Sequence, residues 1–369
     1  MKLKKTIAVA ELRALLENKI PVQILDVRPK EEREEWIIPG SVFVDVYDQL
    51  KSGEKDLFSE ALTPKNTPVI TVCAAGKTSL IAMEQLRKNG IEAYSLDGGM
   101  RAWTSAWNTA TTVDRLGTTI IQIRRTGKGC LSYLLESKGE VIVIDASLDA
   151  AVYSTIAKKK NWKIKYVIDT HIHADHFSRG KKLAEISGAS LYLPKQKTIT
   201  YPFNPIQDGA MLRFGDAVLE AIHTPGHTHE SYSYSVNDES LFTGDTLFTE
   251  GVGRPDLKAT KEIAKEKTSL LYQSLKKIMS LKDTLNIYPG HTSNPVPFDE
   301  LLISKKLQEI KHKVSVLHLN EEDFIASLLN KIPETPPNYE AIVQLNLKGE
   351  ANGVNLIKLE AGANCCAIS

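Results

Sequence analysis

The chain has 369 residues, of which 42% are hydrophobic and 25% charged, a globular composition that disfavours disorder and allows two or three domains. Lys and Arg total 46 against 45 Asp and Glu, and this balance excludes the basic footprint of a nucleic-acid-binding or anionic-membrane-binding protein and favours a small-molecule substrate. No apolar run reaches about 18 residues, and Glu11 interrupts the N-terminal one, so we expect no membrane span, no signal peptide and a cytoplasmic location.

The first hundred residues predict a small doubly wound α/β domain. Residues 22–27 and 69–73 are typical of buried parallel strands, and residues 79–90 predict a helix. Cys73 ends the second strand, where backbone N–H groups and the positive end of the helix favour a nucleophilic thiolate over the commoner inert, buried cysteine. Lys77 lies in a loop whose composition indicates an anion cradle.

Three stretches in this region, "ILDVRPKEEREEWIIPGS", "CAAGKTS" and "LDGGMRAW", resemble in that order a rhodanese domain over residues 1–108. The resemblance implies that Cys73 attacks a sulfane sulfur, becomes a persulfide and passes that sulfur to sulfite or to a thiol. Lys77 is then a candidate for stabilising the anionic sulfur donor. Rhodanese loops often carry an arginine where Thr78 stands, so we expect weak turnover with thiosulfate.

A second α/β pattern starts after a boundary near residue 110. Residues 118–125, 130–137 and 141–147 follow one another at hairpin-like spacing and predict an antiparallel sheet.

Three segments further along predict helices. Residues 259–281 predict a surface helix whose apolar stripe consists of Ile263, Leu271, Leu275 and Ile278. Residues 301–313 and 320–331 predict two more, the second with Asn320 as its N-cap. We expect residues 301–369 to form a C-terminal extension that packs on the preceding domain.

The stretch "THIHADH", residues 170–176, concentrates three of the nine histidines of the chain in seven positions. His171 and His173 are two residues apart, so in an extended chain their rings point the same way, and Asp175 and His176 follow. This clustering predicts a metal site rather than isolated structural histidines.

More candidate ligands follow strand-like runs: His227 in "HTPGHT", Asp245 in "LFTGDT" and His291 in "IYPGHT". The Gly and Pro residues beside them predict sharp turns that project all three side chains into a common cleft. Cys130 is expected only to pack, and the pair Cys365 and Cys366 is expected to have no catalytic role.

These four ordered motifs resemble the metallo-β-lactamase superfamily over residues 115–300, which implies an αβ/βα sandwich with a metal site at one edge. Two branches stay open. In binuclear hydroxyacylglutathione hydrolases, usually with zinc, the matching residues hold two ions with Asp245 between them. His171, His173 and His227 take one ion, and Asp175, His176 and His291 take the other.

In persulfide dioxygenases a single Fe(II) takes only the residues that match His171, His227 and Asp245, a facial triad with open positions for substrate sulfur and O₂. "GVGRPD", residues 251–256, resembles a loop of that branch, and Arg254 is a candidate for binding a carboxylate of a glutathione-like thiol. Residues 321–346 together with "LEAGANCCAI" resemble the C-terminal extension of bacterial members that are fused to rhodanese domains.

The rhodanese resemblance favours the dioxygenase, because a thioesterase has no evident need of a sulfurtransferase. We therefore expect one Fe(II) per chain, oxidation of a thiol persulfide by O₂ to sulfite and thiol, and sulfur transfer through Cys73 that involves sulfite or thiosulfate. The alternatives are a binuclear zinc thioester hydrolase and a sulfur-carrier module with an idle metal domain. A homo-oligomer is compatible with the sequence.

Overall fold

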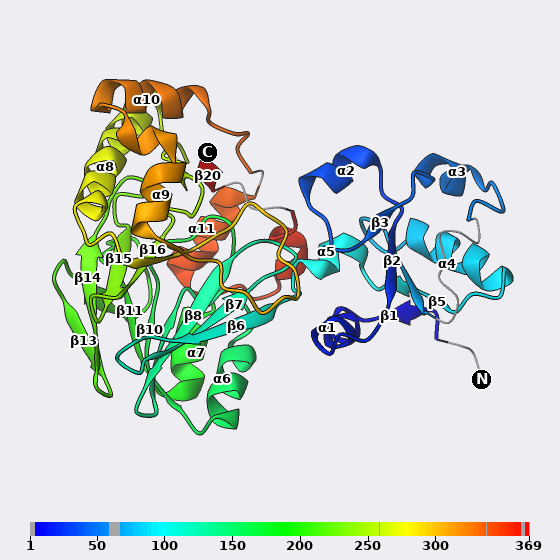
Figure 1. Ribbon diagram of the computed structural model, residues 1–369, viewed down its shortest axis with the longest axis horizontal. Helices are drawn as coiled ribbons and strands as arrows, with labels where there is room; N and C mark the ends of the chain where they lie inside the picture. The colour runs from blue at the N-terminus through cyan, green and yellow to red at the C-terminus, as the bar shows by residue number, and fades with distance from the viewer. Residues whose placement is uncertain (1–3, 59–66, 258, 337, 363–365, 369) are drawn as a thin grey trace.

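The computed structural model describes residues 4–58, 67–257, 259–336, 338–362 and 366–368. Figure 1 shows an N-terminal domain, blue to cyan, beside a larger domain that contains the "THIHADH" segment and is called the metal domain below. The expected fold class is confirmed: a doubly wound N-terminal domain, a sandwich and a C-terminal helical extension. Within the described residues, no helix combines the length and the apolarity that crossing a bilayer requires.

The N-terminal domain is built on a five-stranded sheet in the order β1-β5-β4-β2-β3, with every pair parallel. Its central strand β4 is buried along its whole length, because apolar clusters pack on both faces of the sheet. The elements are β1 Thr6–Ile7, α1 Val9–Glu17, β2 Gln23–Asp26, α2 Lys30–Glu35, β3 Val42–Phe43, α3 Tyr47–Ser52, β4 Val69–Val72, α4 Thr78–Lys88, β5 Ala93–Leu96 and α5 Gly99–Trp103.

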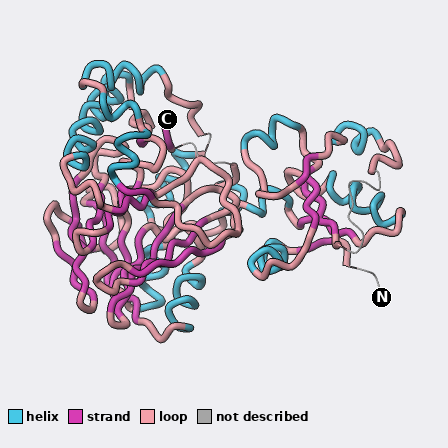
Figure 2. Tube along the Cα trace, in the orientation of Figure 1, coloured by secondary structure: helices cyan, strands magenta, loops and turns pink. Residues whose placement is uncertain are grey.

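The metal domain is a four-layer sandwich (Figure 2), in which two sheets enclose one apolar core and helices cover their outer faces. The first sheet includes the antiparallel set β7, β8 and β9 that the sequence predicts. It comprises β6 Asn108–Val113, β7 Thr119–Arg124, β8 Leu131–Ser137, β9 Glu140–Ile144, β10 Lys163–Ile168, β11 Ser190–Pro194 and β12 Asn204–Ile206, covered by α6 Ala150–Lys159 and α7 Gly180–Ser187. The second comprises β13 Met211–Phe214, β14 Ala217–His223, β15 Tyr232–Val236, β16 Ser240–Gly244, β18 Asn286–Pro289 and β19 Lys305–Lys306, covered by α8 Lys261–Met279, α9 Leu307–Lys313 and α10 Glu321–Asn330.

The helix predicted over residues 301–313 is wrong in its first half. Residues 305 and 306 form β19, which pairs with β18 at the sheet edge, and only α9 from Leu307 is helical. The free edge of β18 offers hydrogen bonds that outweigh local helix propensity there. The N-cap at Asn320 is confirmed, since its side chain accepts a hydrogen bond from the Asp323 N–H. In the helix predicted over residues 259–281, Ile263 is not part of the buried stripe, because it is 37% exposed.

The chain ends in short elements that return to the metal domain. They are the 3-10 helix Ser315–His318, α11 Tyr339–Lys348, α12 Leu356–Leu359 and β20 Ala367–Ile368, which pairs with β17 Val252–Gly253. In Figure 1, α12 lies between the metal domain and α5, and these two helices are in contact.

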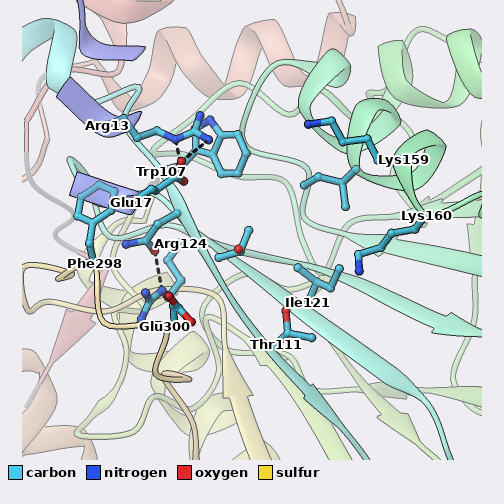
Figure 3. Close-up of a pocket in the computed structure, with 13 residues that line it drawn as sticks. Arg13, Glu17, Trp107, Thr111, Ile121, Arg124, Lys159, Lys160, Phe298 and Glu300 are labelled. Atoms are coloured by element: carbon cyan, nitrogen blue, oxygen red, sulfur yellow. Dashed lines mark hydrogen bonds and ion pairs between the residues drawn. The ribbon is translucent and has the colours of Figure 1, made fainter. Parts of the chain in front are cut away.

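The two domains meet through buried polar contacts. The Trp36 indole N–H donates to the Thr126 carbonyl at 2.9 Å, and the Arg125 guanidinium donates to the Thr104 carbonyl at 3.0 Å. A pocket of about 470 Å³ opens beside this junction (Figure 3), where the Arg13 guanidinium lies 3.5 Å from the Trp107 ring centre. None of the candidate site residues lines this pocket, so it is separate from the site described next.

Candidate metal centre

The ends of four strands bring the predicted ligand residues to one edge of the sandwich. The segment "THIHADH" follows β10, His227 follows β14, Asp245 follows β16 and His291 follows β18. The glycine before His291 is required by close approach, because a Cβ at Gly290 would lie 2.7 Å from Asp245 Oδ1.

His171, His227 and Asp245 form one cluster whose ligand atoms all lie within 4.8 Å of one another. Asp245 Oδ2 is 3.9 Å from His171 Nε2 and 3.6 Å from His227 Nε2, and it has no hydrogen-bond partner among the described residues. A buried, unpaired carboxylate oxygen facing two imidazoles is a set of donors that fits a metal ion.

Neighbouring groups fix which nitrogen of each imidazole is free. Thr170 Oγ1 donates to Asp145 Oδ2 at 2.9 Å, so it accepts from His171 Nδ1–H, also at 2.9 Å. His227 Nδ1–H donates to the Arg254 carbonyl at 2.7 Å. Both histidines therefore present an unprotonated Nε2 toward Asp245, and burial lowers the pKa of each, which favours the neutral, ligating form.

His291 uses both of its nitrogens on carboxylates. Its Nδ1 lies 2.6 Å from Asp245 Oδ1 and its Nε2 lies 3.0 Å from Asp175 Oδ2. Burial alone would lower the pKa of His291, but the two carboxylates raise it well above 6.5. In turn burial would raise the pKa of Asp245, yet His291, His171 and His227 keep it below its usual range. His291 therefore acts as a charged hydrogen-bond donor to Asp245 in this arrangement.

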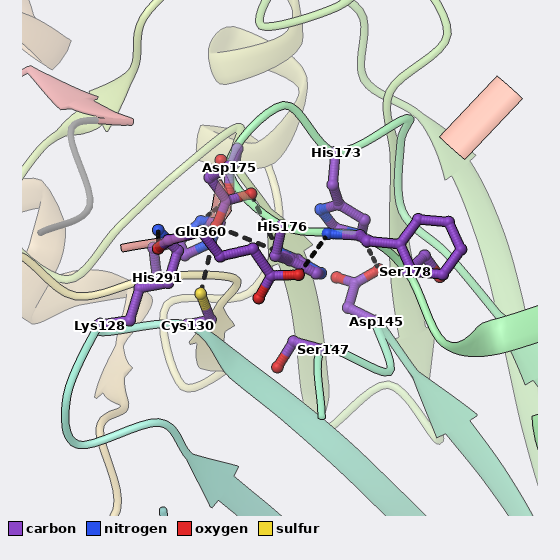
Figure 4. Close-up of polar contacts among 12 residues, drawn as sticks. Lys128, Cys130, Asp145, Ser147, His173, Asp175, His176, Ser178, His291 and Glu360 are labelled. Atoms are coloured by element: carbon purple, nitrogen blue, oxygen red, sulfur yellow. Dashed lines mark hydrogen bonds and ion pairs between the residues drawn. The ribbon is translucent and has the colours of Figure 1, made fainter. Parts of the chain in front are cut away.

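Asp175, His176 and Cys130 complete a second cluster with His291 (Figure 4). His176 Nδ1 donates to Asp175 at 3.0 Å, and although burial lowers the pKa of His176, Asp175 raises it to about 9. The Cys130 thiol donates to Asp175 Oδ2 at 3.1 Å. Burial and Asp175 raise the pKa of that thiol, but Arg125, His176 and His291 outweigh them and lower it to about 7. Cys130 thus does more than the packing expected of it, and nothing in the local sequence around it signals this contact.

His173 belongs to a third cluster, with Asp145 and Asp169. Its Nε2 donates to Asp145 Oδ1 at 3.2 Å, while its Nδ1 has no hydrogen-bond partner among the described residues. Asp145 has a left-handed backbone, φ 54°, an uncommon conformation outside glycine that aims its carboxylate at both Thr170 and His173.

The Arg254 side chain is occupied by protein groups. It is fully buried, its guanidinium makes a bidentate pair with Asp256 at 2.8 Å, and it also donates to the Pro333 and Glu334 carbonyls. The substrate-binding role expected for this side chain stays a prediction, and these contacts with protein groups argue against it. The residue contributes its backbone instead, through the carbonyl that orients His227.

A cavity of about 330 Å³ opens onto His227 and contains a cation that sequence reasoning missed. Lys267 of α8 lines it, with Glu230, Leu257 and Tyr339 among the other lining residues. Burial lowers the pKa of Lys267 to about 8. A lysine on the buried stripe of α8, one turn before Leu271, was the available sequence signal.

Of the C-terminal cysteine pair, the structure describes only Cys366. Cys366 is buried with its sulfur within 4.8 Å of ligand atoms of Asp245 and His291, and burial raises the pKa of its thiol well above 9. Cys365 lies outside the described residues.

Cys73 lies at the end of β4, as predicted, and its side chain is buried with Sγ 3.2 Å from Ser79 Oγ. The first amides of α5 clasp the loop: Met100 N–H donates to the Cys73 carbonyl at 2.9 Å and Arg101 N–H to the Ala74 carbonyl at 3.0 Å. A Cβ at Gly99 would lie 2.1 Å from the Cys73 carbonyl oxygen, which explains the glycine in "LDGGMRAW". Lys77 is exposed and precedes the first residue of α4.

Comparisons with known proteins find a family match in each of the two domains. The sequence profile of the rhodanese-like domain matches residues 8–106, and that of the metallo-beta-lactamase superfamily matches residues 125–291. A hydroxyacylglutathione hydrolase from Pelagibacter ubique (strain HTCC1062) is 37% identical over 177 residues, 46% of this chain and 70% of that protein.

A hydroxyacylglutathione hydrolase from Rhizobium etli is 33% identical over 157 residues, 42% of this chain and 57% of that protein, so the chain spans little more than half of its length. The crystal structure of ETHE1 from Myxococcus xanthus aligns with a TM-score of 0.54 and 26% identity, and the alignment covers 62% of this chain and 97% of that one.

Proposed function

From the premise that the chain belongs to the metallo-beta-lactamase superfamily and carries a rhodanese-like domain before the metal domain, we propose that it oxidises a low-molecular-weight thiol persulfide with O₂ to sulfite and thiol. Proteins of this fold bind metal ions. We assign one Fe(II) per chain to His171, His227 and Asp245, and we assign sulfur transfer to Cys73.

The observation that carries this proposal is a difference in hydrogen bonding among the metal-site histidines. His171 and His227 each leave an Nε2 free toward the unpaired Asp245 Oδ2, whereas His291 has no free nitrogen. Two histidines and one carboxylate on one side of the ion are the ligands of oxygen-using non-haem iron sites. The structural likeness to ETHE1 supports the same branch.

When bound by these three residues, ferrous iron would supply open positions for sulfur and O₂ and would relay to O₂ the electrons that the outer sulfur of the persulfide loses. Overall, one persulfide, one O₂ and one water give one thiol and one sulfite. The protein groups hold this site in shape: His291 keeps Asp245 Oδ1 hydrogen-bonded so that Oδ2 faces the two imidazoles, and the Arg254 carbonyl fixes the His227 ring.

The cavity beside His227 suits the thiol carrier. Its volume of about 330 Å³ and its mixed lining are those of a small-molecule site, and the Lys267 ammonium would attract a carboxylate of a glutathione-like thiol. Lys267 thereby takes the role that the sequence assigned to Arg254. The N-terminal domain would then move sulfane sulfur between this chemistry and sulfite or thiosulfate through a Cys73 persulfide.

Oxygen uptake with glutathione persulfide tests the proposal, using protein reconstituted anaerobically with Fe(II) and a zinc-loaded control. We expect uptake only with iron, with sulfite formed in step. Absence of uptake in the iron-loaded protein would refute the dioxygenase.

The second candidate is a binuclear zinc thioester hydrolase of the hydroxyacylglutathione type. The unpaired, buried His173 Nδ1 and His176 Nε2 favour it, because in a binuclear site His173 would bind the ion held by His171 and His227, and His176 would bind the second ion. The names of the sequence relatives favour it as well. Two zinc equivalents per chain with fast glutathione thioester cleavage would identify it.

A further inference from the structure

The C-terminal segment 338–362, called the C-terminal wall below, covers the metal centre. Tyr339 and Val343 of α11 line the cavity beside His227. Tyr339, Ile342 and Leu359 also line a smaller cavity, of about 60 Å³, beside Asp175 and Cys366. The wall is therefore in contact with both sides of the ligand cluster, although no ligand residue comes from it.

Asn346 of the wall is bonded to the ligand segment by every polar atom of its side chain. Its Nδ2 donates to the His173 carbonyl at 2.8 Å and to the His176 carbonyl at 2.9 Å, while its Oδ1 accepts from the Ser178 N–H at 2.8 Å. The side chain is only 4% exposed, so water cannot replace these bonds. One amide thus fixes the backbone on which His173, Asp175 and His176 stand.

Glu360 holds the same segment at Phe177, directly after His176 (Figure 4). Its carboxylate accepts from the Phe177 N–H at 3.0 Å and pairs with Arg125 at 3.0 Å and with Arg179 at 2.6 Å. The Glu360 side chain is 1% exposed. A buried carboxylate with two guanidinium partners and a backbone donor resists displacement, because losing any partner leaves a buried charge uncompensated.

The same contacts reach the N-terminal domain. Arg125 also donates to the Thr104 carbonyl, just after α5, at 3.0 Å, and α12 packs against α5. Helix α5 in turn clasps the Cys73 loop through its first amides. The wall therefore joins the metal centre to the domain that carries Cys73.

We infer that Asn346 and Glu360 are positioning residues of the metal centre, and that docking of the C-terminal wall and binding of the metal ion stabilise each other. The inference depends on a metal ion being bound by the cluster and not on which reaction follows. Partners outside the ligand shell set ligand geometry, and changing one costs about 10–100-fold in metal affinity. By linkage, the ion must strengthen the wall as much as the wall strengthens the ion.

The test replaces Asn346 with aspartate, which keeps size and shape but turns a carboxylate oxygen toward the His173 and His176 carbonyls. Asn352→Asp is the matched control, because Asn352 belongs to the same wall and is exposed. Metal-free full-length proteins are titrated with Co²⁺ against a competing chelator, and the visible spectrum of bound Co²⁺ is recorded. We expect Asn346→Asp to weaken binding about 10-fold or more and to shift the spectrum, with Asn352→Asp unchanged.

Wild-type affinity and spectrum in Asn346→Asp would overturn the inference, and so would an equal loss in Asn352→Asp. If Asn346→Asp does not fold, Glu360→Gln is compared with Glu350→Gln, an exposed wall residue, under the same expectation and the same criterion for rejection. Hydrogen exchange of α11 in the wild type gives the reciprocal measurement: slower exchange with metal is expected, and unchanged exchange would contradict linkage. No arm uses persulfide or O₂, so absent oxygen uptake would refute the proposed function alone.

Discussion

The Cys73 loop and the metal centre differ in how much of the chain each requires. Cys73 and Lys77 are the first and last residues of the five-residue loop 73–77 between β4 and α4. The metal centre brings together candidate ligands and His291 from four loops, a backbone carbonyl from Arg254 and supporting contacts from Asn346 and Glu360. A reactive thiol needs only a local turn and nearby amides, whereas an ion needs donors that converge from several strands. The two sites should therefore fail independently when a reacting residue is changed.

Removal of the Cys73 thiol is expected to have the largest effect. Cys73→Ser leaves a hydroxyl that is a far weaker nucleophile, so sulfur transfer from thiosulfate or a persulfide should fall by a factor on the order of 10⁴ or more. Oxygen uptake by the iron-loaded protein should persist. Both rates are measured on one preparation, and loss of both together would contradict separate sites.

Removal of the carboxylate at Asp245 is the converse experiment. Asp245→Ala deletes the unpaired Oδ2 and leaves His291 without one acceptor, so metal content and metal-dependent turnover should fall by more than the ~100-fold typical of an outer-shell change. Sulfur transfer through Cys73 should stay within a factor of about two. Metal analysis and a sulfurtransferase assay check this, and a parallel loss of sulfur transfer would show that the two sites are not independent.

The difference between the two sites also explains what the sequence could predict. Local patterns predict Cys73 at the end of a strand and the α/β sandwich. They also predict that His171, His227 and Asp245 lie close together, because strand ends of one sheet meet at one edge. Local patterns do not predict the partners that orient each imidazole. Thr170 and Arg254 act through a hydroxyl and a carbonyl that no spacing rule distinguishes.

The contacts of Arg254 could not be predicted for a related reason. Its motif is typical of a substrate-binding loop, but Asp256 and two carbonyls about 80 residues away in sequence occupy its guanidinium. Asn346 and Glu360 both stand in tail stretches that the sequence singled out, yet their contacts with the ligand segment depend on how α11 and α12 dock. Long-range docking decides these roles, and the local sequence does not encode it.

Within the metal domain, a change at Lys267 is expected to separate substrate binding from the chemical step. Lys267→Met keeps the stem and removes the charge, so KM for glutathione persulfide should rise about 10-fold with kcat little changed. Because burial lowers the Lys267 pKa to about 8, the wild-type KM should itself rise above pH 8 as the ammonium loses its proton. Steady-state kinetics from pH 6 to 9 check both effects, with the exposed Lys265→Met as control; a pH-independent wild-type KM would contradict this role.

The smallest expected effect concerns the acid stability of the C-terminal wall, which joins the metal centre to the domain of the Cys73 loop. Burial would raise the pKa of Glu360, but Arg125 and Arg179 lower it below its ordinary value of 4.5. A carboxyl whose pKa is depressed on folding contributes stability in full above 4.5 and loses that contribution as the pH falls through its folded value. Metal-free wild type should therefore melt a few degrees above Glu360→Gln at pH 6, and this gap should close in acid. Thermal melts at successive pH values measure the gap, while Glu350→Gln should show none. A gap that stayed constant down to pH 3 would mean that the Glu360 charge does not hold the wall, and that its hydrogen bond to Phe177 alone accounts for the contact.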